Sequence, residues 1–311
     1  MNILGSISRS LMIPEETLGY LIRTAPFRYK VFKVEKRNGK GKRTIAQPAR
    51  EVKDLQYWVM EKILHNFPIH SAATAYRAGR SITTNAAKHA PNHFLLKMDF
   101  KDFFNSIRSD DLDAYLRKLS SEEWGDKDIE YLKRILFWDK ERRGRLVMSI
   151  GAPSSPMLSN ILLYDFDRRV QAFCTPRRVR YSRYADDLAF STNKPNVLRE
   201  VEVEVVRICK RMRHPKLTVN AEKTVHASAR VARRVTGLVL TNEGSVSLGR
   251  DRKRLIRAQI HRFLMGGLNL EEKGKLRGML AFVNSAEPSF IEKLRDHYGS
   301  AEIDKIFKMS D

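Results

Sequence analysis

Apolar residues recur every three or four positions along much of the chain, which is the period of an amphipathic helix. The stretch 51–65 is the clearest, because Val52, Leu55, Val59 and Ile63 fall on one face. The stretch 200–212 also alternates like a strand over part of its length, but its total length favours a helix. The pattern predicts helices over residues 14–21, 51–65, 81–90, 109–119, 128–138, 158–170 and 200–212, followed by three helical stretches from residue 250.

Shorter apolar runs bounded by turn residues are typical of strands. Residues 29–36 and 43–46 flank Asn38-Gly39, a pair that accepts positive φ at low cost, and therefore predict a hairpin. The run 235–240 predicts a strand that pairs with residues 245–248. Further strands are predicted at residues 93–99, at 145–149, at 217–220 and on both sides of a turn within 181–191.

Acidic residues stand at the ends of two of these predicted strands. Asp99 closes an apolar run, and burial without a counter-charge would cost it several kcal/mol, so it either reaches solvent or meets a cation. Asp186 and Asp187 occupy the turn within 181–191, where two carboxylates repel each other and need water or a divalent cation. A solvated turn is the ordinary interpretation of an Asp-Asp pair alone. If both segments are neighbours in one sheet, however, the three carboxylates can together hold two Mg²⁺ ions for phosphoryl transfer.

The charge balance points to a polyanionic partner. The 311 residues contain 58 Lys and Arg against 36 Asp and Glu, a net charge of +22, which favours nucleic acid. No apolar run approaches the roughly 20 residues needed to span a bilayer, so we expect a cytoplasmic protein with no membrane partner. Cys174 and Cys209 are too few for a disulfide framework or a cysteine-rich zinc site.

Three local patterns have both an ordinary and a functional interpretation. The cations of the first hairpin are either a solvated face or a clamp for a triphosphate. The Gly/Pro/Ser loop from Gly151 leads into a helix, whose free N–H groups could hold a phosphate, although an ordinary turn has the same composition. The basic amphipathic helix from residue 250 favours nucleic-acid contact over simple solvation because of the overall charge. Its candidate cations are Arg250, Lys253, Arg254 and Arg257.

Several motifs in a fixed order resemble those of reverse transcriptases, specifically of the bacterial retron group, over nearly the whole length. They are Arg43-Thr-Ile with Gln47-Pro48, Asp54-Leu-Gln56, Met98-Asp-Phe-Lys-Asp-Phe-Phe104, Gly151-Ala-Pro-Ser-Ser-Pro156, Tyr184-Ala-Asp-Asp187 and Lys223. Two more are similar to signatures of the retron group, namely Asn85-Ala-Ala-Lys-His89 and Val235-Thr-Gly237. Each motif alone is weak, whereas eight in order are specific.

The resemblance implies an α+β right-hand polymerase fold. Residues 1–93 would form an N-terminal helix and the fingers, and residues 249–311 a helical thumb. Residues 94–248 would form an antiparallel-sheet palm with a helical insertion at about 109–150 that contributes to the fingers.

The same resemblance implies roles for individual residues. Asp99, Asp186, Asp187 and the Phe100 carbonyl would hold two Mg²⁺ ions. The residues that would bind the nucleotide are Lys36, Arg43, Phe104, Gly151 and Lys223, with Phe104 as the gate that excludes a ribose 2′-OH. The residues that would bind RNA are Asn85, His89, Val235, Thr236, Gly237 and the four cations of the basic helix. One position departs from the pattern, because Ile150 stands where many relatives have Gln, which puts a polar contact to the nucleotide sugar in doubt.

A retron enzyme would copy its own structured noncoding RNA into DNA primed from an internal guanosine 2′-OH. Its partners would then be that RNA, the branched RNA–DNA product (msDNA), dNTPs and an effector protein of anti-phage defence. A host RNase H would remove the template, because the residues that follow the basic helix are too few for an RNase H domain. Two alternatives remain. One is a reverse transcriptase of the group II intron or diversity-generating type, and the other is a basic RNA-binding scaffold whose acids are structural.

Overall fold

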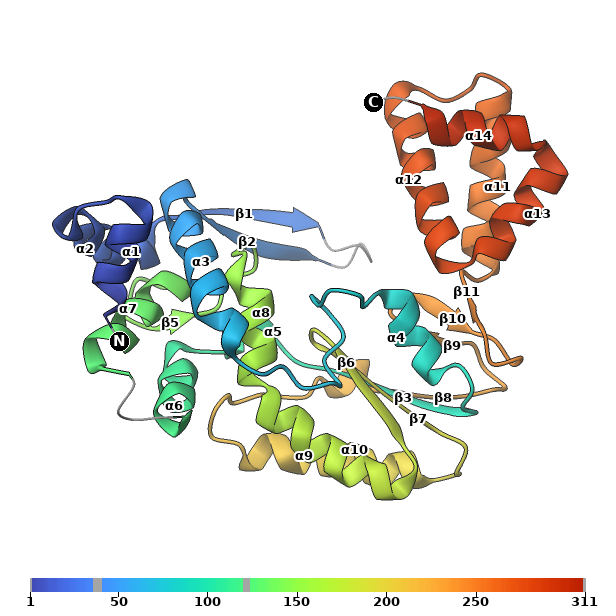
Figure 1. Cartoon of the computed structure of the whole chain (residues 1–311). Coiled ribbons are helices and arrows are strands. Elements are labelled where there is room, and N and C mark those ends of the chain that lie inside the picture. The colour runs from blue at the N-terminus through green and yellow to red at the C-terminus, as the bar shows by residue number, and fades with distance from the viewer. Residues whose placement is uncertain (1, 36–40, 120–123, 310–311) are drawn as a thin grey trace. The chain divides into compact units, whose positions relative to one another are not determined.

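The computed structural model describes residues 2–35, 41–119 and 124–309 (Figure 1). Its α-helices are α1 (Ile3–Leu11), α2 (Glu15–Thr24), α3 (Arg50–Lys62), α4 (Ile82–His89), α5 (Phe103–Ser106), α6 (Ser109–Leu119), α7 (Asp126–Leu136), α8 (Ser154–Leu162), α9 (Tyr164–Cys174), α10 (Val197–Arg211), α11 (Arg250–Leu264), α12 (Leu270–Ala286), α13 (Pro288–Tyr298) and α14 (Ser300–Lys308). Its strands are β1 (Tyr29–Glu35), β2 (Lys42–Pro48), β3 (Phe94–Asp99), β4 (Trp138–Asp139), β5 (Leu146–Val147), β6 (Arg180–Tyr184), β7 (Asp187–Thr192), β8 (Val225–Ser228), β9 (Arg233–Val235), β10 (Leu238–Leu240) and β11 (Val246–Ser247).

The chain forms two compact units, each assembled from separate segments. The first unit contains Met1–Ala78, Met98–Leu188 and Arg199–Thr224. The second unit contains Gly79–Lys97, Ala189–Leu198 and Val225–Asp311.

The predicted helices are confirmed, although several begin or end elsewhere, and four helices, α11–α14, stand where three helical stretches are predicted from residue 250. The stretch predicted as 128–138 is α7, which ends at Leu136 because Trp138 is buried and pairs with Val147 in a short β-ladder. The single helix predicted over 158–170 is two helices, α8 and α9, which are separated at Leu163. Helix α1 was not predicted. Asn2 caps its N-terminus, since Asn2 Oδ1 accepts a hydrogen bond from the Gly5 N–H at 2.9 Å.

The predicted first hairpin is confirmed by the antiparallel pairing of β1 and β2. Its register runs from Tyr29 opposite Pro48 to Glu35 opposite Lys42. The base of β2 is anchored, because Ala46 packs with the buried Trp138. The turn residues Asn38 and Gly39 lie outside the described residues.

The central sheet has the strand order β6-β7-β3-β8. The order confirms that the run ending at Asp99 and the strand-turn-strand around Asp186 are neighbours in one sheet. In the first unit, α9 packs against β6, and Figure 1 shows the two elements side by side. The strand predicted at 217–220 is wrong: Val219 makes only an isolated bridge to Phe100, and the strand predicted at 145–149 is reduced to β5.

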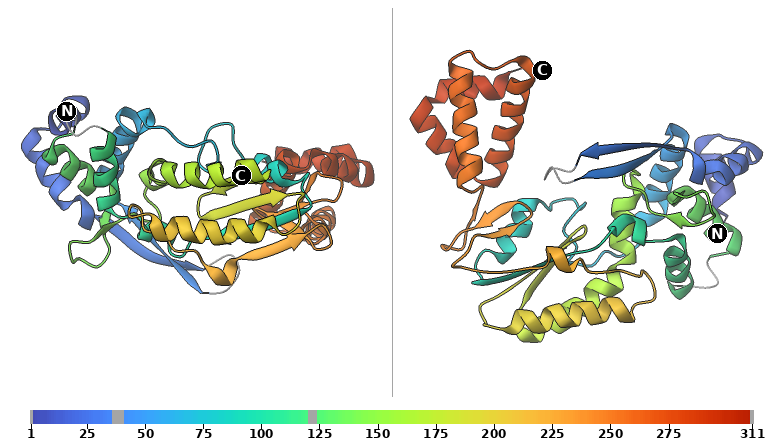
Figure 2. Two further views of the ribbon diagram at one scale, coloured as in Figure 1. Left: turned by 90° about the horizontal axis from the view of Figure 1, so that it is seen from below. Right: turned by 180° about the vertical axis from the view of Figure 1, so that it is seen from behind.

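In the second unit, α4 and the small sheet β11-β10-β9 pack together. The prediction of one strand over 235–240 is wrong, because the chain reverses at Thr236 (φ 47°) and Gly237 (φ 81°). Two successive positive φ angles are what a tight two-residue hairpin turn requires. Helix α12 contacts α11, α13 and α14, and the bundle of these four helices is visible in both views of Figure 2.

Candidate active site

The backbone of the first unit brings Asp99 and Asp186 together. Asp99 is the last residue of β3, and Asp186 lies in the turn between β6 and β7. The Phe100 N–H donates to the Asp186 carbonyl at 3.3 Å, which joins the end of one strand to the turn. On the other side, the Asn220 N–H donates to the Asp99 carbonyl at 2.7 Å. The two acids are therefore held by main-chain hydrogen bonds from different parts of the chain.

Lys223 is the cation at this acidic centre. Its Nζ lies 2.9 Å from Asp99 Oδ1 and 3.0 Å from Oδ2, while its side chain remains 59% exposed. The hydrogen bond to Asp99 raises the pKa of Lys223, and the charges of Asp99, Asp186 and Asp187 raise it further. Asp99 is therefore hydrogen-bonded to this ammonium group, and Asp186 and Asp187 lie within its electrostatic reach.

Asp186 is the acid most affected by its surroundings. Burial raises the pKa of its carboxyl, and the negative charge of Asp99 raises it further. Lys223 and Arg43 act in the opposite direction, because both are cations within electrostatic reach of Asp186. Burial and the charge of Asp99 together outweigh the two cations, so the ionised form of Asp186 is disfavoured.

This donor set fits a divalent cation. Carboxylate and carbonyl oxygens are the ligands that Mg²⁺ prefers, and Asp99, Asp186, Asp187 and the Phe100 carbonyl can supply them. Among the described residues no three acidic, histidine or cysteine side chains form a ready metal cluster, and Lys223 is hydrogen-bonded to both oxygens of Asp99. A metal ion would thus bind the Asp99 carboxylate either together with Lys223 or in its place.

The described nucleotide-binding candidates, Arg43, Phe104, Gly151 and Lys223, all belong to the first unit. Arg43 is exposed on β2 and lowers the pKa of Asp186. Phe104, in α5, is half-buried, and its ring centroid lies 5.1 Å from that of Phe103. Lys36 lies outside the described residues.

Gly151 has a position that only glycine fits well. Its φ is 121°, and a Cβ there would lie 3.0 Å from the Ala46 carbonyl oxygen. The Ala46 N–H donates to the Ile150 carbonyl at 2.8 Å, so the backbone at Ile150 holds β2 against this loop. The hydroxyls of Ser154 and Ser155, at the start of α8, are buried and have no hydrogen-bond partner within the described part of the chain.

Tyr76 is a site residue that the sequence did not reveal. It is 51% exposed and has a φ of 59°, which is rare for a residue with a large side chain. Burial raises the pKa of its hydroxyl, and the nearby charge of Asp186 raises it further. Its ring centroid lies 6.5 Å from that of Tyr184. No periodicity or motif marks a strained backbone angle, so only the structure could find it.

The second unit places the two retron-like signatures together. Asn85 and His89 on α4 are buried, and His89 Nδ1 lies 2.8 Å from Ser191 Oγ. The Thr236 hydroxyl donates to the Ile82 carbonyl at 3.0 Å, which ties the β9–β10 turn to the start of α4. Buried side chains do not reach RNA directly, so Asn85 and His89 can act by holding this surface in place.

The basic helix is α11, on which Arg250, Arg254 and Arg257 are exposed. Lys253 is half-buried, because its Nζ lies 2.5 Å from Glu287 Oε1. A hollow of about 610 Å³ beside the start of α11 is lined by, among others, Arg230, Arg234, Arg250 and Lys253. Cations gathered around a hollow suit a phosphate group.

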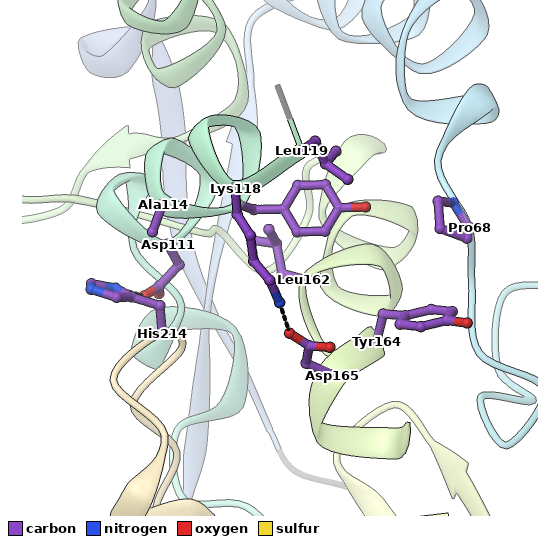
Figure 3. Close-up of a pocket in the computed structure, with 10 residues that line it drawn as sticks. Pro68, Asp111, Ala114, Lys118, Leu119, Leu162, Tyr164, Asp165 and His214 are labelled. Atoms are coloured by element: carbon purple, nitrogen blue, oxygen red, sulfur yellow. Dashed lines mark hydrogen bonds and ion pairs between the residues drawn. The ribbon is translucent and has the colours of Figure 1, made fainter. Parts of the chain in front are cut away.

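A separate pocket of about 420 Å³ lies in the first unit between α6 and the α8–α9 junction (Figure 3). Its lining combines apolar groups such as Leu119 and Leu162 with the ion pair of Lys118 and Asp165 and with a hydrogen bond of 2.9 Å between His214 Nδ1 and Asp111 Oδ1. The pocket contains none of the residues of the candidate active site.

Comparison with known proteins assigns a class to this site. The family model of reverse transcriptases (RNA-dependent DNA polymerases) matches residues 34–249, a range that includes all three acids and Lys223. The chain is therefore a reverse transcriptase, an RNA-directed DNA polymerase, and its mixed helices and sheet are those of the right-hand fold.

Individual relatives identify the group of reverse transcriptases to which the chain belongs. The Retron Ec83 reverse transcriptase of Escherichia coli is 40% identical over 285 residues, which cover 91% of each protein. The Retron Ec86 reverse transcriptase of Escherichia coli is 33% identical over 98% of this chain and 93% of that protein. The chain belongs to the retron reverse transcriptases.

Solved structures give more distant matches. A telomerase from Candida albicans in complex with a fragment of telomeric RNA matches at 16% identity over 91% of this chain and 61% of its own, with a TM-score of 0.48. A foamy viral protease-reverse transcriptase in complex with double-stranded DNA matches at 14% identity over 90% of this chain and 43% of its own, with a TM-score of 0.48. Within the described residues, no helix has both the length and the apolar character to cross a membrane.

Proposed function

We propose that Asp99, Asp186 and Asp187 are the catalytic acids and that, with the Phe100 carbonyl, they hold two Mg²⁺ ions. The observation that carries this proposal is the main-chain hydrogen bond from Phe100 to Asp186, which joins the strand end at Asp99 to the Asp186 turn, together with the contact between Lys223 and Asp99. When bound, the ions would neutralise charge on the reacting phosphates and activate the attacking hydroxyl. The protein supplies fixed carboxylates at the ends of rigid strands.

The nucleotide site would lie between this centre and the first hairpin. Lys36 and Arg43 would bind the triphosphate, while Gly151 would let the loop before α8 lie close to β2. Lys223 would exchange Asp99 for the phosphates of the bound nucleotide. Phe104 would exclude a ribose 2′-OH by steric contact, so the product is DNA.

The RNA site would involve the second unit. Val235, Thr236 and Gly237 would present a turn supported by α4, in which Asn85 and His89 hold the helix against its neighbours. Arg250, Arg254 and Arg257 would contact phosphates, and Lys253 would orient α11 through Glu287. In this scheme residues 1–93 are the N-terminal helix and fingers, 94–248 the palm with its insertion at 109–150, and 249–311 the thumb.

The biological reaction would be that of a retron in the cytoplasm. The enzyme would copy a cognate structured noncoding RNA from an internal guanosine 2′-OH into branched msDNA. A host RNase H would remove the template, and an effector protein would use the product in anti-phage defence. Membership of the retron family supports this proposal.

The linkage of the first nucleotide tests the proposal. Purified protein would be incubated with its noncoding RNA, Mg²⁺ and dNTPs, and the product treated with a nuclease that cleaves only 2′,5′ branches. We expect the DNA to be released by this nuclease. A 3′,5′ linkage would instead indicate a primer of the group II intron or diversity-generating type, and tight RNA binding without incorporation would indicate a scaffold.

A further inference from the structure

Arg183 is a charged residue in the interior of the first unit. It lies on β6, and its exposed fraction is 0%, as is that of its partner Asp167 on α9. Its Nε and one terminal nitrogen donate to the Asp167 carboxylate at 2.9 and 2.7 Å, a two-point contact. The Tyr181 hydroxyl donates to the same carboxylate at 2.7 Å, so the acid itself is fixed.

Stability alone is a weak reason for such a pair. The free energy needed to remove both charges from water offsets much of their mutual attraction. Well-packed apolar residues of similar volume therefore often give an equally stable protein. Burial lowers the pKa of the Arg183 guanidinium, but Asp167 raises it more, so Arg183 remains charged. The pair therefore has a property that apolar residues lack, which is a set of directed hydrogen bonds.

The remaining donor of Arg183 is directed at the turn that carries Asp186. Its other terminal nitrogen donates to the Ala185 carbonyl at 3.2 Å and to Asn160 Oδ1 at 3.1 Å. Ala185 has a φ of 56°, a left-handed conformation that strains a residue with a Cβ. The guanidinium thus holds a strained residue from inside the protein.

The geometry gives this hydrogen bond a consequence for Asp186. The Ala185 carbonyl and the Asp186 N–H belong to one planar peptide group, so fixing the oxygen fixes that plane. The next plane, which contains the Asp186 carbonyl, is held by the Phe100 N–H at 3.3 Å. The backbone on both sides of Asp186 is therefore anchored, and with it the direction of the Cα–Cβ bond from which its carboxylate extends.

We propose that Arg183, oriented by Asp167, is a positioning residue that fixes the catalytic turn and so sets the affinity of the acidic centre for divalent metal. The proposal rests on the role proposed above for Asp186. Arg183 itself touches neither substrate nor metal. Loss of a residue that orients a metal ligand typically lowers metal affinity about 10- to 100-fold.

The test compares the wild-type protein with Arg183→Met combined with Asp167→Leu, which removes both charges and keeps the volume. Mn²⁺ binding is measured by electron paramagnetic resonance without nucleotide, and the half-saturating Mg²⁺ for DNA synthesis is measured at saturating dNTP. We expect the melting temperature to stay within a few degrees, while metal affinity falls at least about 10-fold by both measurements. Unchanged metal affinity in the folded double variant would overturn the proposal.

Two further variants complete the test. Arg183→Lys keeps the positive charge but lacks the planar guanidinium that donates to Asp167 and Ala185 at once. If the double variant does not fold, the metal affinity of Arg183→Lys, measured in the same two ways, tests the proposal. The matched control is Gln56→Leu, because Gln56 is also fully buried in the first unit and donates to a backbone carbonyl, that of Ile135 at 2.8 Å. It should lower stability without changing metal affinity. Asp186→Asn separates the two proposals: persistent synthesis by that variant contradicts the catalytic role of Asp186, whatever Arg183 does.

Discussion

Replacing Lys223 with Met should tighten metal binding in the absence of nucleotide. The substitution removes the ammonium from Asp99 and keeps an unbranched side chain of similar length. A metal ion and Lys223 compete for the same carboxylate oxygens, so removing one competitor favours the other. The same change should raise the KM for dNTP, because Lys223 is proposed to contact the bound nucleotide.

The size of the effect follows from charge and exposure. Two unit charges about 4 Å apart attract each other by about 1 kcal/mol in bulk water and about 4 kcal/mol at an effective dielectric constant of 20. Since the Lys223 side chain is 59% exposed, the lower value applies. A difference of about 1 kcal/mol corresponds to about a fivefold gain in Mn²⁺ affinity.

The pH dependence of protein stability gives a second test of the Lys223→Met variant. Because the pKa of Asp186 is raised in the folded protein, ionising Asp186 opposes folding, and stability without metal falls as the pH rises through that raised pKa. Lys223 partly lowers this pKa, so Lys223→Met should raise it and extend the fall in stability to higher pH. Urea unfolding without metal, repeated across acidic and neutral pH, measures this.

The control for net charge is Lys118→Met, which removes a cation paired with Asp165 outside the acidic centre. It should leave Mn²⁺ binding unchanged. Weaker Mn²⁺ binding by Lys223→Met would contradict this prediction, because it would mean that Lys223 supports metal binding and does not compete with it.

Three other outcomes are expected. Asp186→Asn should stabilise the metal-free protein at pH 7, seen as a higher midpoint of thermal unfolding, because it removes a buried charge and its repulsion with Asp99. The control Asp139→Asn should destabilise the protein, since the Asp139 carboxylate accepts backbone N–H groups at 3.0 and 2.7 Å. Phe104→Ala should admit ribonucleotides in a primer-extension assay, and unchanged discrimination would show that Phe104 acts only in packing. RNA affinity should fall steeply with salt, and Arg254→Gln should reduce the slope of log K against log salt by about 1; an unaltered slope would remove Arg254 from the contact surface.

Much of the acidic site could be predicted because its signals are local. An apolar strand that ends in Asp99 and a strand-turn-strand around Asp186 each follow from residue pattern, and the sheet order confirms that they are neighbours. The presence of Lys223 at Asp99 was expected only from the resemblance, since nothing in the spacing of the two residues brings them together.

Other features depend on contacts between distant residues, which pattern alone does not show. Helix α1 contains Gly5 and three serines, which interrupt its apolar pattern. Asn2 nevertheless caps the helix, and the Ile3 N–H donates to Asp128 Oδ1 at 2.8 Å. The left-handed angle at Tyr76 depends on the fold around it. The turn at Thr236 was missed because its flanking residues read as one continuous apolar strand.

DNA synthesis by the Asp186→Asn variant tests the catalytic role of Asp186 most directly. Wild-type protein and the Asp186→Asn variant would each be given the cognate noncoding RNA, Mg²⁺ and labelled dNTPs, with folding verified by thermal unfolding. We expect labelled DNA from the wild-type protein and none from the variant, although the variant is at least as stable and still binds RNA. DNA synthesis by Asp186→Asn at the wild-type rate would contradict it.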